Sequence, residues 1–212
     1  MTNLLQKNEQ TGRSMVEMLG VLAIIGVLSV GGISGYSKAM TKFKITKTFD
    51  QVTMMVANIR TLYSGQRNYK GLATAIAIDM GVVPAEMSGP DSKATANTIQ
   101  NAFQGDVAVS AIKYNEKDAT AFYISYGNLG REACVSILTA DWGAGTSSGF
   151  LGIKVESSKK ATSQTAVPTA QTVTSKAGAA VYGSLHLPVT PAEASVDCQC
   201  TNDECAVTWF YL

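Results

Sequence analysis

The chain has 212 residues, with 17 Lys and Arg against 16 Asp and Glu, so its formal charge is +1. That balance gives no electrostatic reason to expect a nucleic acid or a strongly acidic substrate as a partner. The length leaves room for one membrane-spanning helix and one globular domain of about 150 residues. Hydrophobic residues make up 46% of the chain and charged residues 16%, an imbalance that an apolar segment near the N-terminus inflates.

The first 12 residues are polar, and the apolar segment begins shortly after them. No charged side chain occurs from Met18 to Ser37, and about 20 helical residues reach about 30 Å, the thickness of a bilayer core. A secretory signal peptide would show a shorter apolar stretch and a small-residue cleavage site after it. Because this segment instead continues into Lys38 and Lys42, we predict an anchor that spans a membrane over about residues 18–37.

One carboxylate, Glu17, stands at the start of this apolar segment. An ionised carboxylate at the centre of a bilayer costs on the order of 2.5–3.5 kcal/mol, so an acid at this position needs a reason. The cost is small while the acid stays hydrated at the membrane edge. In one interpretation, therefore, Glu17 is only an interfacial residue of an ordinary signal anchor.

The sequence GRSMVE at residues 12–17, followed by about 20 apolar residues, resembles the class III signal of type IV pilins and pseudopilins. The resemblance implies that a prepilin peptidase cuts between Gly12 and Arg13, on the cytoplasmic side, and removes residues 1–12. It also implies that Glu17, the fifth residue of the mature chain, neutralises the N-terminal ammonium of a neighbouring subunit in a filament. Arg13 departs from the family, whose mature, N-methylated chains usually begin with Phe, Met or another apolar residue.

Beyond the apolar segment, the pattern indicates that the helix continues into a covered region. Apolar residues alternate in steps of four and three, which is typical of a helix buried on one side, and Gly65 offers a stop. We predict one helix over about residues 13–64, roughly 75 Å long, and a globular head over residues 65–212. The apolar stripe consists of Ile45, Phe49, Val52, Val56, Ile59 and Tyr63.

The head reads as an α+β fold, an antiparallel sheet packed on the long helix. Apolar residues at helical spacing predict a helix over residues 129–142, and residues 157–180, which lack an apolar period, are predicted to be a mobile surface loop. Alternation with β-branched or aromatic residues predicts strands at residues 107–114, 120–126, 150–157, 181–189 and 206–212.

The head adds to the resemblance. Tyr69, Leu72, the sequence GVVP at residues 81–84 and Met87 precede NAFQG at residues 101–105. Together with the alternating strand that follows, they look like the heads of type IVb pilins, including plasmid thin-pilus pilins.

Four cysteines allow three pairings, in an exported domain where disulfides are expected. Cys198 and Cys200 are two apart in a stretch predicted to be extended, so they are poorly placed to bond each other. The turn-forming sequence TNDE would bring Cys200 opposite Cys205 across a short hairpin. We favour Cys134–Cys198 with Cys200–Cys205, and Cys134–Cys200 with Cys198–Cys205 is the second choice.

Three of these cysteines, Cys198, Cys200 and Cys205, are with His186 also the candidates for a metal site. Their C-x-C-x4-C spacing lacks the paired C-x-x-C knuckles of zinc domains, and His186 alternates with leucines as a solvent-facing strand residue would. No nucleophile elbow, P-loop, dinucleotide fingerprint or metalloprotease motif occurs in the sequence. We therefore expect no catalytic residues, no metal and no cofactor.

The resemblance implies a structural subunit of a type IV pilus, acting in adhesion, aggregation or conjugation. Its precursor would lie in the bacterial inner membrane and meet the prepilin peptidase and an assembly platform there. Copies would then polymerise through their N-terminal helices into an extracellular homopolymer. The alternatives are a minor pilin or a type II secretion pseudopilin and, from another class, a membrane-anchored periplasmic binding module that does not polymerise and retains residues 1–12.

Overall fold

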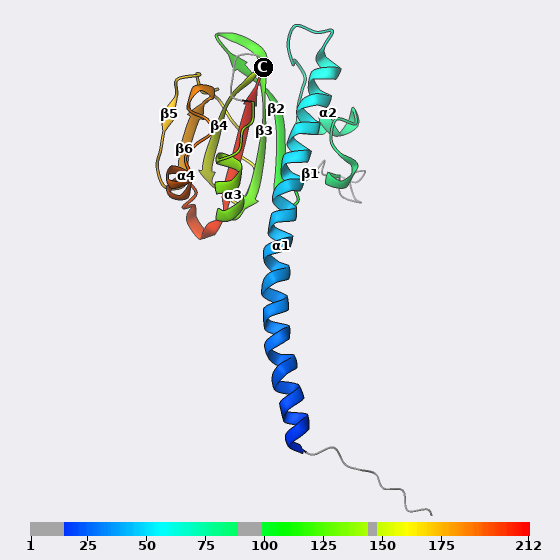
Figure 1. Ribbon diagram of the computed structural model, residues 1–212. Coiled ribbons are helices and arrows are strands. Elements are labelled where there is room, and N and C mark those ends of the chain that lie inside the picture. The colour runs from blue at the N-terminus through cyan, green and yellow to red at the C-terminus, as the bar shows by residue number, and fades with distance from the viewer. Residues whose placement is uncertain (1–14, 89–98, 144–147) are drawn as a thin grey trace, which may run out of the picture. The chain divides into compact units, whose positions relative to one another are not determined.

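The computed structural model describes residues 15–88, 99–143 and 148–212. The chain divides into two units, residues 1–42 and residues 43–212. The leader residues and the predicted cut between Gly12 and Arg13 lie outside the described residues. Figure 1 shows the elements of the second unit, which contains the sheet.

The predicted long helix is present as α1, Met15–Tyr63. Five of the six residues of the predicted stripe are buried, and Phe49 is half-buried against the same core. Met55 is also buried, because it falls between the stripe residues on the same helix face. The 3.5-residue period of the sequence therefore identifies the face of α1 that the head covers.

The described part of the head is built around one antiparallel sheet in the order β1-β2-β3-β7-β4-β6-β5. β7 comes last in the sequence yet lies between β3 and β4, where both of its edges are paired. The strands are β1 Ile99–Gln100, β2 Asp106–Tyr114, β3 Lys117–Leu129, β4 Phe150–Ser157, β5 Val173–Thr174, β6 Ala179–Gly183 and β7 Cys205–Tyr211.

The two faces of the sheet differ in chemistry. On β3, Phe122, Ile124 and Tyr126 join the main core together with the stripe of α1, whereas Ser125 belongs to the opposite face. Alternation along a strand explains this division. Trp209 of β7 lies in the main core and packs edge-on against Tyr126, with ring centroids 5.3 Å apart. The central strands are therefore buried on both faces.

Short helices complete the head. α2, Thr74–Asp79, and the 3-10 turn η1, Ala85–Met87, follow α1. α3, Arg131–Leu138, buries Ala133, Cys134, Ile137 and Leu138 in the main core. Three more elements lie toward the C-terminus: the 3-10 turn η2, Ser184–His186, the helix α4, Pro191–Asp197, and the 3-10 turn η3, Thr201–Asp203. Figure 1 places α4 and β5 at the end of the sheet away from α2.

The fold class and four of the five predicted strands are confirmed, but the prediction at residues 181–189 is wrong. The strand there ends at Gly183, and the chain turns through η2 because Leu187 and Val189 enter the main core. His186 is exposed, as expected, but in this 3-10 turn. The predicted helix at residues 129–142 is shorter, Arg131–Leu138, since β3 continues to Leu129.

The helix α4 was not among the elements predicted from the sequence. Thr190 accepts from the backbone N–H of Glu193, and the Glu193 side chain accepts from the Thr190 backbone. This capping box, with Pro191 at the first helical position, is a recognised start signal. The signal was therefore present in the sequence, although the helix is only seven residues long.

Residues 158–172, predicted to be part of a mobile surface loop, instead form a strap across the outer face of the sheet, the face that carries Ser125 and lies opposite α1. Thr162 donates its backbone N–H to Ser125 Oγ at 3.0 Å, and Gln164 Nε2 donates to Glu156 Oε2 at 2.8 Å. Gly127 and Gly183 lack the room for a Cβ because backbone atoms of the strap lie against them. The pattern of residues 157–180 alone does not reveal the strap, because Ser125 and Gly127, which it contacts, lie more than 30 residues earlier in the chain.

Met55 and Met54 offer a matched test of how the head covers α1. Met55 is fully buried and accepts from the Tyr126 hydroxyl, whereas Met54 is 51% exposed. We expect Met55→Ala to lower the free energy of unfolding by about 2–5 kcal/mol. Met54→Ala should change it by no more than about 0.5 kcal/mol. Denaturant unfolding of the full-length chain in detergent measures both, and equal losses would contradict this assignment of the covered face.

Candidate assembly helix, disulfides and groove

The first unit contains the N-terminal part of α1, whose residues 15–39 are all exposed. Its most apolar 18-residue window has a mean hydropathy of 2.2 and none of that window is buried, so the helix is long and apolar enough to cross a membrane. Large exposed apolar side chains recur along it from Met15 to Ile33. Such a surface is unstable in water and needs lipid or another protein around it.

Glu17 lies in the first turn of α1 as the structure describes it. A carboxylate there is favoured by the positive end of the helix dipole. The residue is exposed, as are its neighbours Val16 and Met18. Its carboxylate is therefore available to a partner outside the chain.

Two disulfides link the cysteines in the pairing that the sequence analysis favoured. Cys134 of α3 is joined to Cys198, with Cα atoms 5.8 Å apart, and Cys200 is joined to Cys205, with Cα atoms 5.4 Å apart. Because all four sulfurs are in disulfides, none is available as the thiolate that a metal would bind. Among the described residues, no cluster of His, Cys, Asp and Glu could hold a metal ion.

The local geometry around the bridges differs from the prediction. Cys198 ends α4, with φ −84° and ψ 17°, and does not lie in an extended stretch. Cys200 and Cys205 are brought together by η3 and not by a hairpin. The predicted turn chemistry does apply, since Asn202 and Asp203 both have positive φ, a conformation that Asn and Asp tolerate.

A buried carboxylate lies next to the long disulfide. Asp197 is fully buried, and its carboxylate accepts from the hydroxyls of Tyr182 and Ser175. Burial, together with the bond to Asp197, raises the pKa of the Tyr182 hydroxyl to about 12. The two hydroxyls satisfy the carboxylate, and they join α4 to β6 and to the segment after β5.

A groove of about 620 Å³ lies between α1 and η1 on the head. Phe43 and Met54 of α1 line it and are 60% and 51% exposed, although both are large and apolar. Glu86 of η1 pairs with Lys47 at 3.2 Å, and a hydrogen bond from Gln51 is the main cause that lowers the pKa of its carboxyl. The other lining residues of this α1–η1 groove are Thr46, Asp50, Pro84 and Ala85.

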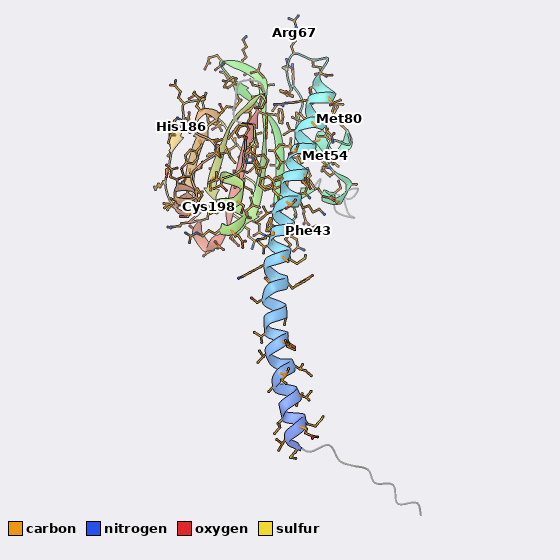
Figure 2. The ribbon with its side chains drawn as sticks, in the orientation of Figure 1. Phe43, Met54, Arg67, Met80, His186 and Cys198 are labelled. Carbon is orange, nitrogen blue, oxygen red and sulfur yellow. A yellow bond between two sulfur atoms is a disulfide. The ribbon has the colours of Figure 1, made fainter. Side chains whose placement is uncertain are left out.

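The groove is not predicted by the buried stripe of α1, which lies on another face of the helix. Phe43, Lys47, Asp50 and Met54 follow each other in steps of four, three and four residues on a separate face of the helix. Two exposed apolar residues in such a series were the available signal, but only η1 makes the face concave. Figure 2 labels Phe43 and Met54 on α1, and His186 at the other end of the sheet.

The comparisons with known proteins agree with this architecture. The chain is 26% identical, over 99% of its length and 98% of the relative, to the major structural subunit of the bundle-forming pilus of Escherichia coli O111:H-. It is 25% identical to the toxin coregulated pilin of Vibrio cholerae, over 64% of this chain and 59% of that protein. The crystal structure of TcpA, a type IV pilin from the El Tor biotype of V. cholerae, superposes with a TM-score of 0.52.

That superposition covers 80% of this chain and 99% of TcpA at 17% sequence identity, so it bears on the fold. A long N-terminal helix packed on an antiparallel sheet is thus the fold of a type IV pilin. Residues 42–185, more than half of the chain, match the family described as PilS N terminal. The chain belongs to this pilin family.

The two disulfides should differ in their contribution to stability. Cys134–Cys198 closes a loop of 64 residues and Cys200–Cys205 a loop of 5, and a longer loop restricts the unfolded chain more. We expect Ala at both positions of the long bridge to lower the free energy of unfolding by about 2–4 kcal/mol, and Ala at both positions of the short bridge to lower it less. Denaturant unfolding gives the two values, after peptide mapping without reductant has verified the pairing. A larger loss from the short bridge would refute the loop argument.

Proposed function

We propose that this chain is the structural subunit of a type IV pilus and polymerises through its N-terminal helix. The observation that carries the proposal is the apolar surface of residues 15–33, which none of the residues that the structure describes covers. A pilin fold and the full-length similarity to a major pilus subunit support it. In a filament, the helices of neighbouring copies would cover one another.

Before assembly, lipid would take the place of those neighbours. The proposed precursor spans the bacterial inner membrane over about residues 18–37, with the head on the outer side. A prepilin peptidase would remove residues 1–12, and an assembly platform in the same membrane would pass the mature chain into the extracellular filament. Residues 13–64 would then be the assembly helix and residues 65–212 the head.

Glu17 has a defined part in this proposal. Its carboxylate is tolerable at the hydrated membrane edge but needs a positive partner once it is surrounded by apolar helices. The cut before Arg13 would create an N-terminal ammonium, and the proposed partner of Glu17 is that ammonium on a neighbouring copy. The charge pair would set the axial position of one helix against the next.

Two other roles remain as alternatives: a minor pilin or secretion pseudopilin, and a membrane-anchored binding module that does not polymerise. N-terminal sequencing of material sheared from the cell surface distinguishes them. A chain that begins at Arg13 and is the main component of the filaments supports the proposal. A chain that retains residues 1–12 and stays with the membrane fraction supports the binding module.

Leader removal provides the first test. Gly12→Val should block the cut, because a peptidase site that recognises glycine lacks the room for a valine side chain. Intact-mass measurement of the membrane fraction should then show the full-length chain. Gly20→Val is the matched control, since a Cβ at Gly20 meets nothing within 4 Å, and it should be cut normally. Normal maturation of Gly12→Val would remove the basis of the proposed processing.

Removal of the Glu17 carboxylate provides the second test. Glu17→Ala should leave expression and membrane insertion intact, because loss of an acid from the hydrocarbon edge favours insertion if anything. Filament numbers counted by electron microscopy should nevertheless fall strongly. Glu9→Ala removes an acid from the leader and should leave the count unchanged. An unchanged count for Glu17→Ala would leave only the interfacial interpretation of this residue.

A further inference from the structure

We infer that the heads of neighbouring copies also meet directly, with the turn η2 of one copy seated in the α1–η1 groove of the next. The inference rests on the proposed function, and it adds the surfaces through which the heads bind each other. The occupant of the groove is thus a second copy of this chain, and its central residues are Leu185 and His186.

The α1–η1 groove has the properties of a binding surface. Phe43 and Met54 both line it and are 60% and 51% exposed, and large apolar residues exposed together in a groove are typical of an interaction site. The rim carries two carboxylates, Asp50 and Glu86, against the single cation Lys47, which pairs with Glu86. An occupant should therefore present an apolar side chain beside a hydrogen-bond donor or a positive charge.

η2 presents that combination. Leu185 is 66% exposed, which makes it the most exposed large apolar residue of the described head. Its neighbour His186 is exposed as well, and an imidazole N–H donates to a carboxylate in either protonation state. Leu185 would pack between Phe43 and Met54 of the next copy, and His186 would face Asp50.

The turn is also held in place before binding. Gly183 donates its backbone N–H to Thr172 at 2.7 Å, and Leu185 donates to Ala170 at 3.1 Å, so the strap fixes the turn from one side. Leu187 is buried on the other side. A fixed turn loses little conformational entropy on binding, which favours a small contact of this kind.

The placement of the two surfaces suits a filament. Figure 2 shows Phe43 and Met54 on α1 and His186 at the β5–β6 end of the head. Two different patches that bind each other form a heterologous contact, and such a contact repeats into an open helical array when its rotation does not close a ring. Each copy inside the array would then bind one neighbour through its groove and another through its η2 turn.

Crosslinking in assembled filaments tests the contact. In a Met54→Cys/Leu185→Cys chain, a short thiol-specific crosslinker should convert sheared filaments into a ladder of covalent multimers on a denaturing gel. Each single variant should give no ladder, since it has one thiol at the contact. Leu62→Cys/Leu185→Cys is the matched control, because Leu62 is exposed on α1 but does not line the groove, and it should also give none.

The outcomes separate this inference from the proposed function. If the unaltered chain forms no filaments, the proposed function fails and the inference fails with it. If filaments form and both thiols react with a maleimide dye but no ladder appears, only the inference fails. A ladder that appears instead when Met54→Cys is combined with Val196→Cys, an exposed position on α4, would assign the groove to a different occupant and overturn the role of η2.

A second measurement does not depend on new thiols. Leu185→Ser should lower filament yield by about tenfold or more, because an apolar side chain is lost from each contact. Met80→Ser, at an exposed position of the head that does not line the groove, should leave the yield unchanged. Denaturant unfolding and the two native disulfides verify that both variants fold. Equal yields from two folded variants would refute the contact.

Discussion

The structure depends on one constraint, which is that the apolar surface of α1 has to be covered. The sheet and the short helices cover a stripe that begins at Ile45, and none of residues 15–44 is buried. Apolar area left in water costs about 25 cal/mol per Å², so the exposed residues 15–33 exclude a free monomer in water as a stable form. The helix therefore needs a membrane or further copies around it. In the proposed function, the chain moves from the membrane into a filament of such copies.

The head is built to hold the other half of α1 firmly. Its central strand β7 is the last strand in the sequence. It pairs with β3 on one side and β4 on the other, so it connects the two halves of the sheet. Both disulfides lie just before or at the start of that strand. Cys198 is bonded to α3, and Cys205, which is bonded to Cys200, is the first residue of β7. The strap adds hydrogen bonds on the outer face of the sheet. A pull transmitted along α1 would therefore act on a sheet whose centre is fixed from several sides.

The local sequence pattern was enough to predict features that depend on one element alone. The stripe that contains Val52 and Ile59 gave the covered face of α1, and turn chemistry at Asn202 supported the favoured disulfide pairing. The misses arose where a distant partner decides. Thr162 of the strap is held by Ser125 of β3, 37 residues earlier in the chain, which no period in residues 157–180 reveals. The groove likewise needs η1 beside α1. Phe43 alone therefore did not predict a groove without knowledge of the fold.

The proposed charge pair and the proposed head contact would do different work in one filament. A carboxylate meeting an ammonium among apolar helices contributes little net energy, but it penalises every axial position in which either charge lacks a partner. The helix surfaces contribute affinity without such a preference, since one apolar face packs on another in many positions. A seated Leu185 would add a second fixed point far along the chain from Glu17. Two fixed points on one subunit determine its rotation as well as its height, and each becomes effectively intramolecular once the other has formed.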